Sequence, residues 1–206
     1  MNLNKANLDN LTRLWKRYGA SLMANQGEQC YLNNRWPFRA WAEPLTENLI
    51  QGSLDEAWLS TLPVSTILPI CQKTSQARTQ KVNQQVYEIE ASLLSQNWHF
   101  SFGQTAMYLP LSGKVREQSA FNSKFEIEQV THTHTLKLWV QVTSEAFGYQ
   151  VDETVIQRLI GAEDVQILLV KFGGQAVATA LLFKTADVIG VHQVGVHPKG
   201  ARTGYC

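Results

Sequence analysis

The segment from Val194 to Cys206 carries the residue types that most directly suggest chemistry. A run rich in β-branched residues reaches Pro198 and passes at once into a loop that contains glycine and arginine. A strand that ends in this way presents backbone amides that can hold an anion such as phosphate. We therefore predict an anion site whose members are Lys199, Gly200, Ala201, Arg202, Thr203 and Gly204. The simpler alternative leaves Lys199 and Arg202 as solvated charges of an exposed tail.

Other residues capable of chemistry do not form a recognised motif. His132 and His134 could place two imidazoles on one side of an extended segment, but zinc needs three or four ligands and no further Cys or His has a suitable spacing. We therefore assign no metal. The sequence also lacks Gly-x-Ser-x-Gly, a Gly-Lys-Thr phosphate loop and Gly-x-Gly-x-x-Gly, which argues against the enzyme classes that depend on them.

The composition is that of an ordinary globular protein. Of 206 residues, 44% are hydrophobic and the formal net charge is +1, so the chain has no electrostatic field that would recruit nucleic acid. The polar N-terminus is not a secretory signal, and the longest apolar runs are shorter than the ~20 residues that span a bilayer. The spacing of the three cysteines suits neither a metal nor a redox pair. We expect a cytoplasmic protein without nucleic-acid or membrane partners.

The N-terminal half predicts a mixture of helices and strands. Apolar residues at helical spacing from Leu8 to Leu22 predict an amphipathic first helix that ends near Gly19 or a little later. The aromatic stretch from Trp36 to Trp41 suits an edge strand or a packed loop because Pro37 interrupts it. The further expected elements are a short helix from Ser53 that stops before Pro63, a strand over 64–71, a helix over 75–96 and a strand from Trp98 to Leu111.

The second half predicts a sheet with flanking helices. We expect a strand from Phe125 to Val130, two helices between Leu136 and Gly161, a hairpin over Val165 to Phe183 that turns at Gly173–Gly174, and a strand over Val188 to His197. The polar stretch 112–124 indicates the boundary between the halves. We predict an α/β (α+β) fold with an accessory domain over 1–118, a linker over 119–124 and a second domain over 125–206.

The second domain resembles the first half of a GNAT domain, the fold of a family of acyl-CoA-dependent N-acyltransferases. The order of its elements carries the resemblance, most strongly over Leu168 to Phe183 and Val188 to Gly204. The spacing Val196-x-Pro198, with a glycine six positions after the proline, is similar to the family's pyrophosphate loop, although only Gly204 matches the loop pattern itself. The N-terminal half looks like the accessory domain of bacterial two-domain members. The resemblance implies a mixed sheet.

The resemblance also implies an activity and its site. It implies direct transfer of an acyl group, in the first instance from acetyl-CoA, to the amine of a small molecule or peptide. Main-chain groups of Val194, Gly195 and Val196 would pair with the pantetheine arm. His192 would be the first candidate for the base and Glu145 the second. Taken alone, these residues also suit a half-buried histidine, a solvated carboxylate and an ordinary buried strand.

In the family, further strands and a helix with the leaving-group acid follow the pyrophosphate loop. The resemblance therefore predicts a catalytic domain that is C-terminally incomplete. An open edge on the strand over Val188 to His197 would suit a homodimer. The alternative to an enzyme is a non-catalytic module that binds a ligand or a partner through this edge, or an inactive fragment of an acyltransferase.

Overall fold

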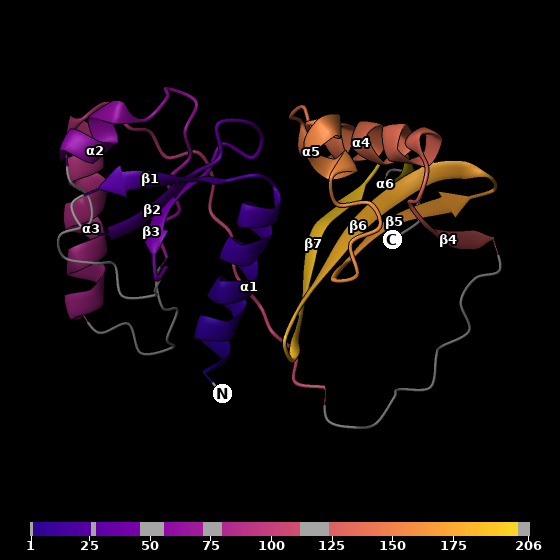
Figure 1. Ribbon diagram of the computed structural model, residues 1–206, viewed down its shortest axis with the longest axis horizontal. Helices are drawn as coiled ribbons and strands as arrows, with labels where there is room; N and C mark the ends of the chain where they lie inside the picture. Colours follow the sequence, from indigo (N-terminus) through magenta and orange to yellow (C-terminus); the bar gives the residue numbers. More distant parts are fainter. Residues whose placement is uncertain (1, 26–27, 46–55, 72–79, 112–123, 202–206) are drawn as a thin grey trace.

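The computed structural model describes residues 2–25, 28–45, 56–71, 80–111 and 124–201. In this part of the chain, helices accompany two antiparallel sheets, one with strand order β1-β2-β3 and one with order β4-β5-β6-β7. Figure 1 shows helix α1 between the two sheets, with α2 and α3 on the far side of the first. The fold is of the mixed α+β class. None of the helices in the described segments is long and apolar enough to span a bilayer.

The first sheet and its helices form the N-terminal unit. Asn2 caps the first helix by accepting from the backbone N–H of Lys5, and the helix stops just before Gly19, as predicted. The elements of this unit are α1 (Leu3–Arg17), β1 (Ser21–Asn25), β2 (Glu28–Leu32), β3 (Ala40–Glu43), α2 (Glu56–Thr61) and α3 (Gln80–Ser95). Helix α2 stops before Pro63, as expected. The aromatic stretch is a packed loop at the buried Trp36 and part of the edge strand β3 at Trp41, so it combines the two expected alternatives.

The second sheet is an antiparallel meander in which two helices connect β4 to β5, and hairpins connect β5 to β6 and β6 to β7. The hairpin between β5 and β6 turns at Gly173 and Gly174, whose φ angles of 56° and 80° a two-residue turn requires. Its elements are β4 (Phe125–Gln129), α4 (Thr133–Phe147), α5 (Glu153–Gln157), β5 (Val165–Phe172), β6 (Gln175–Thr185), β7 (Val188–Val196) and α6 (Pro198–Ala201). The strands and helices predicted for this half are confirmed.

Several expectations for local structure are wrong. Residues 64–71 form no strand and contribute only an isolated bridge between Ile67 and Arg39. Residues 98–111 are not a strand either, because they lack a neighbouring strand in the described chain and Phe100 and Met107 stay exposed. Strands β1 and β2 were not expected, since neither contains a β-branched residue. We expected a mixed sheet in the second half, but all strand pairs of this sheet within the described residues are antiparallel.

The main hydrophobic core joins the N-terminal unit to the second sheet. Trp15 of α1 and Trp41 of β3 belong to the same buried cluster as Trp139 of α4 and Leu181 of β6. A smaller cluster lies within the N-terminal unit, around Trp58 and Leu93. Helix α1 therefore packs on both sheets. The division into domains at 119–124 stays a prediction.

The two faces of the second sheet differ. Helices α4 and α5 lie over one face (Figure 1), and the side chains that point toward them, such as Leu169 and Leu181, are fully buried. The register places Ile127, Ile189 and Val191 on the opposite face, where they are 56%, 57% and 62% exposed. Among the described residues, no helix or strand covers this second face.

Candidate functional site

The C-terminal half of β7 departs from regular strand geometry. Leu181 of β6 pairs with His192 of β7, and Thr179 of β6 pairs with Gly195 of β7. Two steps along β6 therefore correspond to three steps along β7. One extra residue of β7 is therefore accommodated in a bulge, where Gln193 has a φ of 50°. Bulges bend a strand and redirect its peptide groups, and they are frequent beside active sites.

Buried hydroxyls hold this bulge in place. The Oγ1 atom of Thr179 donates to the carbonyl oxygen of Gln193 at 3.1 Å, and it lies 3.1 Å from the Oγ1 atom of Thr143 on α4. Thr143 is itself bonded to the carbonyl oxygen of Trp139. On the outer side, the Tyr149 hydroxyl donates to the Oε1 atom of Gln193 at 3.3 Å. The irregular backbone of β7 is thus fixed by α4, β6 and the segment after α4.

Gly195 lets β7 pass close to the end of α4. A Cβ atom built on Gly195 would lie 2.8 Å from the Cβ atom of Ala146 and 3.2 Å from the ring of Phe147. Any side chain here would force the strand away from the helix. Gly195 is buried, its neighbour Val194 is 59% exposed and Val196 is intermediate. The three residues predicted to bind pantetheine therefore lie together at the bulge.

The outer edge of β7 has no strand beside it in the described chain, because β7 is last in the order β4-β5-β6-β7. Helix α1 approaches β7 through Asn10, at Gly190 and His192. The edge beyond the bulge, at Val194 to Val196, is not paired with any described segment. This is the arrangement that the addition of an extended ligand to a sheet edge requires.

His192 lies in the contact between α1 and β7. Its Nε2 atom is 3.0 Å from the Oδ1 atom of Asn10, whose Nδ2 atom donates to the carbonyl oxygen of Phe183. Burial lowers the pKa of His192 from 6.5 to about 4. The imidazole is therefore neutral at neutral pH, and one of its ring nitrogens is engaged.

Glu145 lies at the other end of the site, on the last turn of α4. Its carboxylate bonds to the Nε2 atom of His197 at 2.7 Å and accepts from the Nε2 atom of Gln141 at 2.9 Å. The bond from Gln141, and then the charges of His197 and Lys199, hold the pKa of Glu145 below its usual value. The structure does not join Glu145 to His192. Its partner is His197, which sequence reasoning missed.

His197 is the first residue after β7 and links the strand to α6. Its Nδ1 atom accepts from the backbone N–H of Lys199 at 3.1 Å, so the proton of a neutral ring is placed on Nε2, toward Glu145. The only sequence signal for this role is its position directly before Pro198, at the predicted loop.

The predicted anion loop begins as one helical turn. Pro198 opens α6, where its fixed φ suits the first position of a helix, so the expected immediate passage into a loop is wrong at this point. Lys199, Gly200 and Ala201 belong to this turn. Arg202, Thr203 and Gly204 lie outside the described residues, so the phosphate role of this segment stays a prediction.

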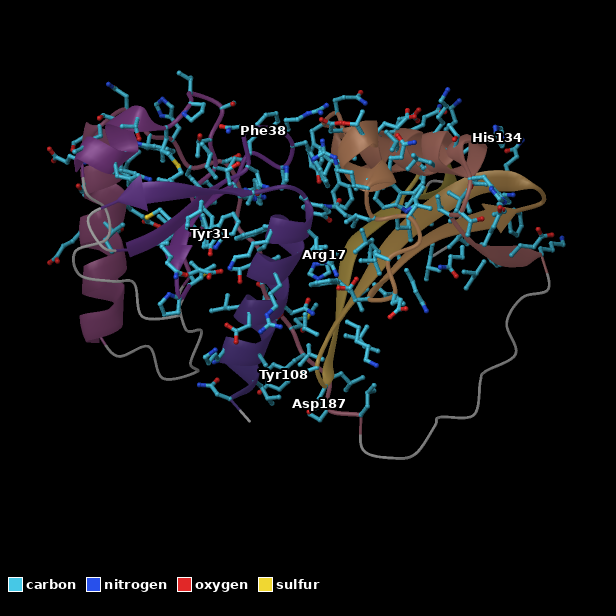
Figure 2. All side chains as sticks on the ribbon, viewed as in Figure 1. Arg17, Tyr31, Phe38, Tyr108, His134 and Asp187 are labelled. Atoms are coloured by element: carbon cyan, nitrogen blue, oxygen red, sulfur yellow. The ribbon has the colours of Figure 1, made fainter. Side chains whose placement is uncertain are left out.

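The two histidines near α4 belong to no group of three potential metal ligands within the described segments. His132 precedes the helix and His134 lies in its first turn, and both are exposed. In Figure 2, His134 lies on the side of the second sheet that is farther from α1. Arg17, in contrast, points from α1 toward this sheet. No group of three or more potential ligands occurs among the described residues.

No family model matches the chain. No curated protein is significantly similar to it in sequence. Among solved structures, it is similar to a GCN5-related N-acetyltransferase from Kribbella flavida, with a TM-score of 0.49 and 15% identity, over 99% of this chain and 76% of that one.

Proposed function

We propose that this chain is an acyl-CoA-dependent N-acyltransferase that moves an acyl group, in the first instance acetyl, to a primary amine by direct transfer. The observation that carries the proposal is the bulge at Gln193, pinned by Thr179 and Tyr149 on the open edge of β7. A fixed irregularity on an unpaired edge offers main-chain donors and acceptors at set positions. An oxyanion is stabilised by donors that need no rearrangement.

The described residues suit the acyl donor. The pantetheine arm of coenzyme A carries amides, which match the extended backbone of Val194 to Val196. The turn that holds Lys199, Gly200 and Ala201 follows directly and would approach the diphosphate, together with Arg202, Thr203 and Gly204. Acetyl-CoA would supply an acyl group already activated as a thioester.

The pair formed by Glu145 and His197 suits proton removal from the acceptor amine. Amines with a pKa of ~10.4 are almost fully protonated at neutral pH, so a base must take a proton before the amine can react. Glu145 is exposed and ionised, and His197 holds its carboxylate beside the bulge. His192, the first candidate on sequence grounds, now ranks second because its Nε2 atom is bonded to Asn10.

Binding and turnover test the proposal separately. Calorimetry with S-acetylpantetheine and with ADP measures the affinity of the strand edge and of the anion loop separately, and calorimetry with acetyl-CoA measures the affinity of both together. Release of free thiol in the presence of an amine panel measures acyl transfer. We expect acetyl-CoA to bind more tightly than either fragment and thiol to appear only with an amine. The absence of heat at millimolar acetyl-CoA would remove the proposed role of β7.

A second candidate is a non-catalytic module that binds a partner, including a second copy of this chain. The observation that favours it is the open apolar face around Ile127, Ile189 and Val191. Analytical ultracentrifugation of the protein and of a Val191→Lys variant tests it. Self-association that the variant abolishes, combined with no binding of acetyl-CoA, would favour the module over the enzyme.

A further inference from the structure

A groove of about 520 Å³ lies between helix α1 and the end of strand β6. We name it the α1–β6 groove. A volume of this size falls within the range of about 300–1,000 Å³ that is usual for sites of small organic molecules. Its lining includes Arg13, Lys16 and Arg17 of α1, Lys184 and Thr185 of β6, and Asp164, which precedes β5.

The α1–β6 groove gathers positive charge. Residues 13, 16 and 17 share one face of α1, because positions three and four apart in a helix are neighbours. Figure 2 shows that Arg17 points from this face toward the second sheet. Lys184 adds a fourth cation to the lining, from β6. Like charges one helical turn apart repel each other, so this arrangement calls for compensating negative charge.

The protein balances only two of these four cations. The Nζ atom of Lys16 lies 2.7 Å from a carboxylate oxygen of Glu43, and the Nη2 atom of Arg17 lies 2.5 Å from one of Asp164. Within the described segments, no ion pair includes Arg13 or Lys184, and both residues are exposed. The groove is therefore left with two positive charges that no described carboxylate balances.

Thr185 adds a hydroxyl whose orientation is fixed. Its Oγ1 atom accepts from the Nδ2 atom of Asn10 at 2.8 Å, so the hydroxyl proton remains for another acceptor. Asn10 lies one turn before Arg13 on α1, and this bond therefore joins the two walls of the groove. A ligand in the groove would meet a hydroxyl donor and cations that are already held in place.

We propose that the α1–β6 groove binds the phosphate monoester of a small organic molecule. A phosphate monoester carries about two negative charges at neutral pH, which matches the two positive charges left in the groove. Its three terminal oxygens accept from guanidinium, ammonium and hydroxyl donors together. The volume of about 520 Å³ also leaves room for the organic part of the ligand.

The α1–β6 groove is separate from the proposed site of the acyl donor. Strands β6 and β7 are antiparallel, so the turn after Thr185 lies at one end of β7 and Pro198 lies at the other. The nine residues of β7 place these two ends about 30 Å apart. The proposal for the groove thus goes beyond the proposed function and does not depend on it.

Three sugars that differ only at one position test the charge of the ligand. Calorimetry at low ionic strength compares glucose 6-phosphate, glucose 6-sulfate and glucose, which carry about two, one and no negative charges. We expect glucose 6-phosphate to bind about fivefold more tightly than glucose 6-sulfate, and glucose to give no heat. Added salt should weaken the binding of both anions, because exposed charges are screened.

Arg13→Gln removes one of the two unbalanced charges. It should weaken the binding of glucose 6-phosphate about fivefold and reduce the preference over glucose 6-sulfate. Lys184→Gln makes the same test from β6. Both residues are exposed and have no described ion pair, so the variants should unfold at the wild-type urea midpoint. Lys137→Gln, at an exposed position on α4, is the control of equal charge and should bind both anions normally.

Four results would overturn the proposal. They are equal affinity for glucose 6-phosphate and glucose 6-sulfate, full affinity in both Arg13→Gln and Lys184→Gln, tighter binding of the dicarboxylate succinate than of glucose 6-phosphate, and no heat with either glucose 6-phosphate or phenyl phosphate. Phenyl phosphate is included because it presents the same phosphate on a different organic group.

Saturating acetyl-CoA separates this proposal from the proposed function. Glucose 6-phosphate should bind with the same affinity in its presence, and Arg13→Gln should bind acetyl-CoA as the wild-type protein does. Competition between the two ligands would overturn the separate groove and keep the site of the acyl donor. Binding of glucose 6-phosphate by a protein that does not bind acetyl-CoA would keep the groove and overturn the proposed function.

Discussion

The Nε2 atom of His192 lies 3.0 Å from the Oδ1 atom of Asn10, which joins residues 182 positions apart in the chain. The same Asn10 side chain donates to the carbonyl oxygen of Phe183 and to the hydroxyl of Thr185. The Nδ2 atom is thus occupied as a donor, and Oδ1 is left to accept from His192. This bond fastens the first helix to the edge of the second sheet.

Protonation of His192 should destabilise the protein at mildly acidic pH. In the unfolded chain the imidazole takes up a proton below pH 6.5, whereas burial holds its pKa at about 4 in the folded protein. The unfolded state therefore binds more protons between these values, and stability falls as the pH drops through this window. The full shift corresponds to about 3 kcal/mol.

Urea unfolding at pH 7 and near pH 4.5 measures this effect. His192→Gln keeps a donor for Asn10 but cannot titrate, so its loss of stability between the two pH values should be clearly smaller than that of the wild-type protein. Carboxylates contribute acid sensitivity to both proteins, and the difference between the two proteins isolates the histidine. Identical pH dependence in both would show that His192 does not titrate as its burial indicates.

Gly190 is required for the contact between Asn10 and His192. A Cβ atom at this position would lie 2.0 Å from the Oδ1 atom of Asn10 and 2.3 Å from the Nε2 atom of His192. Gly190→Ala should therefore lower the free energy of unfolding by about 1–3 kcal/mol, the usual range for overpacking. Gly103→Ala is the matched control, because its Cβ would meet only Phe100, at 3.7 Å.

Combining Gly190→Ala with Asn10→Ala tests the cause of that loss. Once the amide is removed, the added methyl group has room near the helix, so the double variant should lose less stability than the sum of the single variants. Additive losses in a thermal or urea melt would mean that the methyl group clashes elsewhere.

The parts of the fold that were predictable rest on local patterns. The hairpin between β5 and β6 follows from alternating apolar residues and the glycine pair at 173–174, and α4 follows from helical spacing. The candidate site is different, because its relations are tertiary. Nothing near His192 indicates Asn10, and nothing near Glu145 indicates His197, since each partner lies on another element. Patterns along the chain identify titratable residues but not their partners.

Loss of the Thr179 hydroxyl should release the bulge of β7. Thr179→Val keeps the shape of the side chain but leaves the part-buried carbonyl of Gln193 without its donor, which should cost about 1–3 kcal/mol. Thr179→Ser restores the hydroxyl and should recover most of the loss. If the bulge positions an acyl donor, Thr179→Val should also weaken the binding of acetyl-CoA, measured by calorimetry. An unchanged affinity would show that the bulge does not contribute to donor binding.

The proposed acid–base role of Glu145 predicts a defect in turnover without a defect in donor binding. Glu145→Gln retains an acceptor for His197 but removes the charge that takes the proton, so the rate of acetyl transfer should fall by about 10²-fold or more. Acetyl-CoA affinity should not change, because the substituted atoms do not belong to the strand edge. Glu163→Gln, at an exposed position between α5 and β5, is the control and should transfer at the wild-type rate.

The pH profile distinguishes this role from a structural one. The bond from Gln141, followed by the charges of His197 and Lys199, lowers the pKa of Glu145, so the carboxylate stays ionised to a more acidic pH than an ordinary glutamate. Removing that bond by Gln141→Ala should raise this pKa and move the acid limb of the rate profile upward in pH. A Glu145→Gln protein that transfers at the wild-type rate, or an acid limb that Gln141→Ala leaves in place, would assign the base to another group.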